Sequence, residues 1–392
     1  MTEIQKDNKN IANVPPLRFP GFTGEWEVTS IEKNCLLKGR IGYRGYTTGD
    51  LVEKGKGAFV LGGKHIKNQT IDLSEPTFLS WDKYYESPEI MVKVGDIIFS
   101  QRGTLGDCAI IEKEIGFATI NPSMVLLKDI TCNPKFLYYI LIGENIQNEV
   151  QKNKALGAIP MLSQKQIKNF PFLIPKNPNE QQKISSFLSL IDERIQTQIK
   201  IIEELKLLKN TLRYQLYEQI LNQENEIVQI KEVLNYEQPT KYLVSNTDYS
   251  SDNSLIPVLT ANKAFVLGYT AEDFGIYDKG ECIIFDDFTM NTKFVDFPFK
   301  VKSSAIKILT AKSNVNLKFM FEYLSFLGLS SNEHKRHYIS EIEPIEISLP
   351  NYHQQNQIAN ILSKIDEKIK IESNIFTLQT KQKQYFLANI FI

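Results

Sequence analysis

The sequence is poor in the residues that build disulfide frameworks and zinc sites. Its 392 residues include four cysteines and four histidines, and no two cysteines have CxxC spacing. We therefore expect neither a disulfide scaffold nor a structural zinc site. His334 and His337, in NEHKRHY, are spaced for a helical metal pair, but no third ligand is evident. Exposed polar residues are the simpler interpretation, and we predict no metal site.

Long hydrophobic runs are also missing. No apolar stretch approaches the roughly 18 residues that suggest a membrane span. The N-terminal sequence MTEIQKDNKNIANVPP is polar and has no apolar signal-peptide segment. We expect no membrane span, a flexible lead over residues 1–16, and a cytoplasmic protein.

The motifs of nucleotide-binding and catalytic proteins do not occur. Residues 49–55 and 57–63 have one residue too many for a GxxxxGK[ST] phosphate loop, and the wrong residues follow. NPSM (121–124) lacks the second proline and the aromatic of the NPPY-type adenine methyltransferase tetrad. Asp286 and Asp287, in FDDF, suit a metal ion, but we favour a turn cap. The sequence thus predicts a binding protein that is not by itself an enzyme.

One helical phrase occurs twice. ISSFLSLIDERI (184–195) returns 174 residues later as IANILSKIDEKI (358–369), with seven of twelve positions identical. Apolar residues continue after each phrase in alternating steps of four and three, which is typical of a coiled-coil seam. The predicted seam contains Ile184, Leu188, Ile191, Ile195, Ile202, Leu205, Leu212, Leu216, Ile358, Leu362, Ile365, Ile369, Phe376, Phe386 and Ile390.

Polar residues interrupt both seams at matching places. Gln198 corresponds to Glu372, and Lys209 corresponds to Lys383, at the same offset of 174. Polar residues in a seam fix register at a cost in stability. We therefore predict that the two helices pair within one molecule, antiparallel if compact domains lie between them. The alternative is that each helix packs only on its own domain.

The segments that precede the helices are also related. Both carry short alternating runs of Val, Ile, Phe, Tyr and Gly, typical of β-rich mixed domains. IKNFPFLIP (167–175) resembles IEPIEISLP (342–350), and NPKFLYYIL (133–141) resembles NLKFMFEYL (316–324). GDIIF (95–99) has a looser echo in GECIIF, whereas LGGKHIKNQTI and SQRGTLGD have no counterpart.

We predict an α+β fold in which two β-rich mixed domains are separated by two long helices that form an antiparallel coiled coil, with an internal pseudo-two-fold repeat. The expected segments are the lead (1–16), a first domain (17–178), a central helix (179–222), a second domain (223–351) and a distal helix (352–392).

Basic residues gather once in each domain, although the chain has a net charge of only −1. Residues 38–67 hold seven basic against two acidic residues, and residues 291–318 hold six against one, a net of +5 each. Such stretches can neutralise phosphates, and Arg, Asn and Gln can read base edges. Any one of these residues is more simply a solvated surface residue, but together they favour nucleic acid as ligand. The predicted DNA-binding residues are Lys38, Arg40, Tyr43, Arg44, Lys64, His65, Lys67, Gln101, Arg102, Thr104, Asn262, Lys263, Asn291, Lys293, Lys300 and Lys302.

Five stretches carry a family resemblance. They are VPPLRFPGFTGEWEV (14–28), IPKNPNEQQKISSFLSLIDERI (174–195), IFDDFTMNTKFVDFPFKVKSSA (284–305), LPNYHQQNQIANILSKIDEKI (349–369) and FLANIFI (386–392). In these the chain resembles the specificity (S) subunit of a type I DNA restriction-modification system.

The resemblance implies two target-recognition domains, each reading half of a bipartite sequence in double-stranded DNA. It implies helices that set the spacer and dock two methyltransferase (M) subunits, with motor-nuclease (R) subunits joining through this M–S core. S-adenosylmethionine, ATP and Mg²⁺ then belong to the partners, and no cofactor is expected on this chain.

Two departures lead us to expect unequal docking at the two ends: the distal phrase has QQNQI where the central one has EQQKI, and little sequence follows the distal helix.

Two other functional hypotheses remain open. One is a coiled-coil scaffold whose domains bind proteins or glycans, and the other is an enzyme whose site has no recognised motif.

Overall fold

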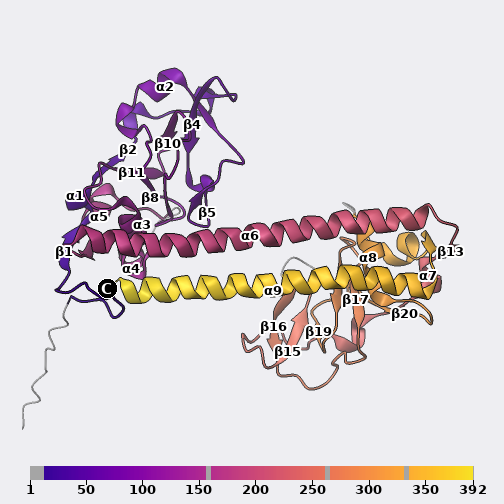
Figure 1. The fold of residues 1–392 in the computed structure, drawn as a ribbon. Helices are drawn as coiled ribbons and strands as arrows, with labels where there is room; N and C mark the ends of the chain where they lie inside the picture. The colour runs from indigo at the N-terminus through magenta and orange to yellow at the C-terminus, as the bar shows by residue number, and fades with distance from the viewer. Residues whose placement is uncertain (1–12, 156–159, 261–264, 331–334, 392) are drawn as a thin grey trace, which may run out of the picture. The chain divides into compact units, whose positions relative to one another are not determined.

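The structure, a computed structural model, describes residues 13–155, 160–260, 265–330 and 335–391. The chain forms two compact units, residues 1–197 with 376–392, and residues 198–375. Two long helices, α6 (Pro178–Leu221) and α9 (Tyr352–Ile390), run through both units (Figure 1). Across the described ranges, no helix combines the length and apolar character that a membrane span needs.

The first unit contains two four-stranded sheets. One is antiparallel, with the order β2 (Leu36–Gly39), β11 (Met124–Lys128), β8 (Ile97–Ser100), β9 (Cys108–Ile110). The other has the order β10 (Ala118–Ile120), β4 (Gly57–Leu61), β7 (Phe78–Ser80), β3 (Leu51–Val52), and its β10–β4 pair is parallel. Two strand pairs complete the strands of this unit: β1 (Glu27–Ser30) with β12 (Pro171–Ile174), and β5 (Ile66–Lys67) with β6 (Thr70–Ile71). Its short helices are α1 (Ile31–Asn34), α2 (Trp81–Tyr85), α3 (Pro134–Ile142), α4 (Glu144–Asn153) and α5 (Gln164–Lys168).

The second unit repeats this plan with fewer strands. Its antiparallel sheet has the order β14 (Leu234–Glu237), β20 (Ile306–Ala311), β17 (Cys282–Asp286), β18 (Thr292–Val295). Its other sheet has the order β16 (Val266–Thr270), β15 (Ile256–Leu259), β19 (Lys300–Val301), and β15–β19 is again a parallel pair. The remaining elements are β13 (Glu226–Gln229), which pairs with β21 (Glu346–Leu349), α7 (Ile230–Val233), α8 (Leu317–Phe326) and a short π-helix (Tyr338–Ile342). The predicted α+β duplication is confirmed.

The same hydrogen bonds tie each domain to the start of a long helix. In the first unit, Asn133 caps α3 by accepting from Phe136 N (2.9 Å), and its own N–H donates to Gln181 Oε1 (3.0 Å). Gln181 in turn donates to Pro175 O (3.0 Å). The same three bonds recur at 2.8–2.9 Å in the second unit among Asn316, Phe319, Gln355 and Pro350. Because the glutamines are buried, their amides must be satisfied, and this fixes where each helix begins.

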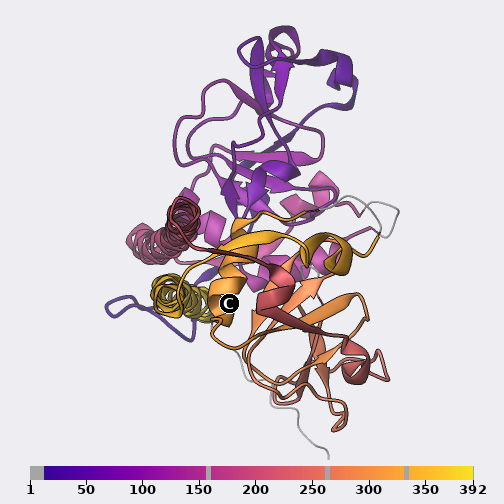
Figure 2. The same cartoon turned by 90° about the vertical axis from the view of Figure 1, so that its right-hand side faces the viewer.

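The apolar seam packs the two helices on each other within each unit. In the first unit, the start of α6 lies against the end of α9, with the rings of Phe187 and Phe386 4.8 Å apart. In the second unit, Leu212 and Leu216, near the end of α6, share a core with Ile358 and Leu362 at the start of α9. The helices are therefore antiparallel, and they lie side by side in both views (Figures 1 and 2). None of the fifteen predicted seam residues is exposed.

Candidate nucleic-acid interface

Three loops of the first unit meet at one edge of its sheets. Because β4 and β10 are parallel, the loops that follow them leave on the same side, and Asn121 N donates to Leu61 O (2.8 Å). The loop after β8 joins them through Gln101 N, which donates to Ser123 O (2.9 Å). We call residues 62–65, 101–107 and 121–123 the first edge.

Glycines allow the loops of the first edge to approach closely. A Cβ on Gly62 would lie 2.4 Å from Asn121 Nδ2, and a Cβ on Gly106 would lie 2.6 Å from Gln147 Oε1. Gly103 and Gly106 also have φ angles of +82° and +87°, which side chains disfavour. Glycine at 103 and 106 is thus favoured by the backbone conformation, and a side chain at position 62 would require the Asn121 side chain to move.

The first edge presents three exposed polar side chains from the predicted set, Lys64, Arg102 and Thr104. Within the described residues, neither Lys64 nor Arg102 forms an ion pair. Gln101 is half-buried and donates to Pro122 O (3.1 Å). An unpaired Arg can bond a guanine edge bidentately, and an unpaired Lys can contact a phosphate. The structure therefore brings together four of the predicted residues, in a form suited to DNA.

The second unit has an equivalent edge. Lys302 N donates to Leu259 O (3.0 Å) and Asp287 N donates to Ala305 O (2.9 Å), the same two contacts that organise the first edge. We call residues 287–291 and 302–305, with Thr260 and Phe265, the second edge. Asn291 and Lys302 are exposed there, and Lys293 is exposed on the adjoining β18. The predicted residues Asn262 and Lys263 lie outside the described residues.

Arg40 is a correction to the predicted set. Its guanidinium is buried, donates to Thr119 Oγ1 (3.1 Å) and Ile120 O (3.3 Å), and lies 5.2 Å from the Tyr46 ring. Burial lowers the pKa of Arg40. Arg40, directly after β2, therefore binds β10 across the two sheets, and its buried guanidinium is already engaged by protein groups.

Lys300 and His65 are corrections of the same kind. Lys300 is fully buried, with Nζ 2.7 Å from Glu272 and 2.6 Å from Phe274 O. Its hydrogen bond lowers the pKa of Glu272. His65 is buried and accepts from Gly62 N (2.9 Å), and burial lowers its pKa. Lys300 therefore stabilises the core of the second domain, and His65 stabilises the loop that begins the first edge by accepting from Gly62.

The other predicted residues of the first domain lie apart from the first edge or are engaged. Lys38 is exposed on β2, and Tyr43 is 80% exposed. Arg44 is half-buried, bonds Glu89 (3.3 Å) and lies over the Tyr43 ring. Lys67 pairs with Asp72 at 2.5 Å. Their contacts with DNA stay predictions.

The FDDF aspartates form turn and anchor contacts. Asp286 Oδ1 accepts from Phe288 N (2.8 Å) and Thr289 N (3.1 Å), so the turn interpretation is confirmed. Asp287 is buried, lies 3.3 Å from Lys307 Nζ, and accepts from Tyr338 N (2.8 Å). The part of the chain that the structure describes contains no cluster of three metal-ligating side chains.

The polar interruptions of the seam pair with each other. Gln198 donates to Glu372 O (3.1 Å) and also to the Glu372 carboxylate. These two positions correspond to each other in the 174-residue repeat, so equivalent residues of the two long helices contact each other. Lys209 binds Asp366 (2.6 Å) in the second unit, and the equivalent residues Lys383 and Asp192 bind at 2.8 Å in the first. Sequence periodicity locates the interruptions but does not reveal these partners.

Beside these pairs the two units differ. In the second unit, the buried Glu322 binds both Lys209 and Arg213 at 2.8 Å. In the first unit, the corresponding residue is Tyr139, whose hydroxyl donates to Asp192 at 2.7 Å. The Lys–Asp pair is thus repeated in both units, but beside it the second unit has a buried glutamate with a second ion pair, and the first unit has a tyrosine hydroxyl.

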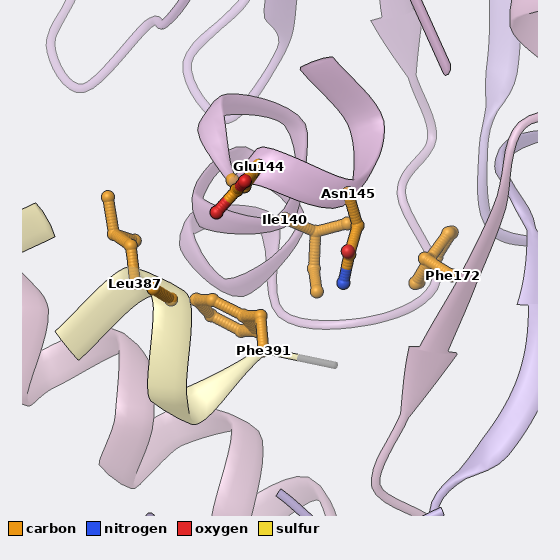
Figure 3. A pocket seen from close by; sticks show the side chains of 8 residues that line it. Ile140, Glu144, Asn145, Phe172, Leu387 and Phe391 are labelled. Atoms are coloured by element: carbon orange, nitrogen blue, oxygen red, sulfur yellow. The ribbon is translucent and has the colours of Figure 1, made fainter. Parts of the chain in front are cut away.

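A small cavity near the end of α9 shows a second difference (Figure 3). It measures about 40 Å³ and is lined by Ile140, Phe172, Leu387 and Phe391, among others. In the second unit, Tyr217 occupies the place of Phe391, and Phe326 stacks on it with ring centroids 5.4 Å apart. Gly143 stands where Phe326 stands, so the first unit leaves the space open. The cavity holds no more than a few waters.

Two equivalent edges with different polar residues, on a duplicated frame, suit a protein that recognises two different half-sites in DNA. The family model described as "Type I restriction modification DNA specificity domain" matches residues 43–207 and 222–377. These ranges cover most of the sequence, and the chain belongs to this family.

Individual relatives agree with this assignment. The chain is 40% identical over 176 residues to the type I restriction enzyme EcoR124I/EcoR124II specificity subunit of Escherichia coli, a match that covers 42% of this chain and 43% of that subunit. It is 24% identical over 346 residues to the putative type I restriction enzyme MjaX specificity subunit of Methanocaldococcus jannaschii, covering 78% of this chain and 80% of that one.

Two solved structures share the fold. The S subunit of a type I restriction-modification system from M. genitalium aligns with a TM-score of 0.63 at 17% identity, covering 97% of this chain and 99% of that one. A chain from a structure of type I R-M complex assembly aligns with a TM-score of 0.54 at 13% identity, covering 92% and 96%.

Proposed function

We propose that this chain is the DNA sequence-specificity subunit of a type I restriction-modification complex. Each domain reads one half of a bipartite target through its edge. The observation that carries the proposal is the recurrence of one edge, held by the same backbone contacts, with different polar side chains in the two domains. A shared frame with different readout residues is what recognition of two different half-sequences requires.

The residues of each edge divide into two roles. Lys64 and Lys302 are suited to phosphates, which supply affinity and its salt dependence. Arg102, Gln101 and Asn291 are suited to base edges, which supply specificity. The chain is then a targeting subunit rather than an enzyme.

The long helices have a separate role. With 44 residues, α6 is about 65 Å long at 1.5 Å per residue. The repeated helical frame suits two copies of one partner, and we assign it to two methyltransferase subunits, with motor-nuclease subunits joining through them. S-adenosylmethionine, ATP and Mg²⁺ are assigned to those partners.

The proposal is tested by methylome sequencing of a methylation-free host that expresses this chain with its cognate methyltransferase subunit. The expected result is methyladenine in one split motif with a fixed gap and a defined half at each end. No new methylation, with both proteins folded and associated, would favour a scaffold that binds proteins or glycans.

A further inference from the structure

A pocket of about 380 Å³ opens on the first domain, at the opposite end of β4 and β10 from the first edge. Its lining includes Lys54, Leu73, Phe78, Trp81, Ile115 and Phe117. These residues come before β4 and β10 or belong to the segment around β7 and α2, whereas the first edge follows the carboxyl ends of β4 and β10. Gly57 and Phe59 of β4 also line it, and Val60 and Leu61 separate them from the first edge along the strand. We call this the amino-end pocket.

Aromatic rings form the walls of the amino-end pocket. Trp81 and Phe117 meet edge to face with ring centroids 5.3 Å apart, and Phe78 meets Phe59 at 5.9 Å. Phe117 is 60% exposed and Leu73 is 42% exposed. Grouped exposed apolar side chains of this kind typically mark an interaction site.

The apolar surface extends beyond the pocket. Tyr85 is 59% exposed and stacks on Trp81 with ring centroids 6.1 Å apart and planes inclined by 28°. A surface that continues past a ring-sized hollow is typical of protein interfaces, in which aromatic residues are enriched. At about 380 Å³, the pocket lies within the usual size range of sites that bind small organic groups.

One charge is directed at this surface. Lys54 is the single ionisable residue that lines the pocket, and it forms no ion pair with any residue that the structure describes. Its neighbours Lys56 and Glu53 bind each other at 2.8 Å. Glu75 and Glu114, beside the lining residues, are exposed carboxylates. One unpaired lysine among carboxylates can bind a single anionic group, but the carboxylates would repel a run of phosphates.

We propose that the amino-end pocket binds a segment of a partner protein that inserts an aromatic or long aliphatic side chain against Trp81 and Phe117. An adjacent carboxylate of that segment pairs with Lys54. The site is distinct from the first edge, because it uses none of the residues of that edge.

The first test measures binding of 8-anilinonaphthalene-1-sulfonate to the full chain. This dye carries fused aromatic rings and one negative charge. Bound dye should accept energy from Trp81, and Trp81→Phe should reduce that transfer to what Trp26 contributes. Phe117→Ala should weaken binding about tenfold, as expected for a central aromatic contact. Lys54→Ala should weaken it about threefold, the range of an exposed ion pair. The matched controls Leu207→Ala and Lys206→Ala, on exposed positions of α6, should leave it unchanged.

The second test distinguishes the kind of occupant by dye displacement. N-acetyl-Phe-Glu-amide should displace the dye about threefold better than N-acetyl-Phe-Lys-amide, and N-acetyl-Ser-Glu-amide should be weaker than both. Lys54→Ala should remove the preference for Glu. Equal displacement by the three peptides, or dye binding unaffected by both Lys54→Ala and Phe117→Ala, would overturn the proposal. Stronger displacement by a short oligothymidylate would make this a nucleic-acid site instead.

Discussion

Replacing Glu322 with Ala tests whether the buried ionic cluster of the second unit organises the helix frame. The Glu322 side chain is 0% exposed and is shared by Lys209 and Arg213, each 2.8 Å away. Removing one partner of a buried ion pair typically costs about 3–5 kcal/mol, because the remaining charge stays desolvated. Lys209 keeps Asp366, and Arg213 is 17% exposed. We therefore expect the free energy of unfolding of Glu322→Ala to fall by about 3 kcal/mol, the lower end of this range.

The corresponding residues of the first unit suggest a second variant that should restore the stability lost in Glu322→Ala. There, Tyr139 and Leu387 occupy the places of Glu322 and Arg213, and the Tyr139 hydroxyl bonds the aspartate. The double variant Glu322→Tyr with Arg213→Leu should reproduce that arrangement, in which a tyrosine and a leucine lie beside the Lys–Asp pair. It should recover most of the loss, since well-packed neutral groups often replace a buried ion pair at little cost.

Urea unfolding followed by far-ultraviolet circular dichroism measures both variants. Tryptophan fluorescence reports the first unit alone, because Trp26 and Trp81 both lie there. Tyr139→Phe is the control, and the loss of its hydrogen bond should cost about 1 kcal/mol. Unchanged stability in Glu322→Ala, or a double variant less stable than the single one, would refute this reasoning.

Three further outcomes follow from the structure. Lys300→Ala should destabilise the protein by about 3 kcal/mol or more in a denaturant titration, because it leaves Glu272 without its buried partner. Lys302→Ala should leave stability unchanged but weaken binding to all DNA and reduce the magnitude of the salt slope by about one. Hydrogen bonds from Lys368 and Gln198 hold the pKa of Glu372 below its ordinary 4.5. Its contribution to stability should therefore be complete above that pH and lost as pH falls through the lowered pKa, and Glu372→Gln should flatten the acid side of the stability curve.

The helices were predictable because their signal is local and repeated. The spacing of Ile184, Leu188 and Ile191 reports one face of a helix, and its recurrence 174 residues later predicts the pairing. The central helix begins at Pro178 and ends at Leu221, close to the expected 179–222. Proline suits the first turn of a helix, where its missing N–H is not needed.

The burial of charged residues was not predictable from composition. Arg40 and Lys300 look like their exposed neighbours in sequence, and their partners Thr119 and Glu272 lie far along the chain. Only the pairing of β10 with β4 and the packing of the second domain bring these groups together. Charge within a stretch therefore indicated the ligand class, but not which side chains face it.

The edges were not predictable for a related reason. They depend on the parallel pairs β4–β10 and β15–β19, whose strands are tens of residues apart. The LGGKHIKNQTI and SQRGTLGD stretches, which lack a counterpart in the second half, contain most of the first edge. Sequence divergence within a repeated frame is thus the sequence signal that coincides with most of the first edge.

The most direct test of the account is methylome sequencing of cells in which Arg102→Ala with Thr104→Ala alters the first edge alone. The account predicts a bipartite motif in which one half is relaxed, while the other half and the gap between them are unchanged. Relaxation of both halves together, or an unchanged motif with the protein folded and bound to its methyltransferase, would contradict the assignment of one half-site to each edge.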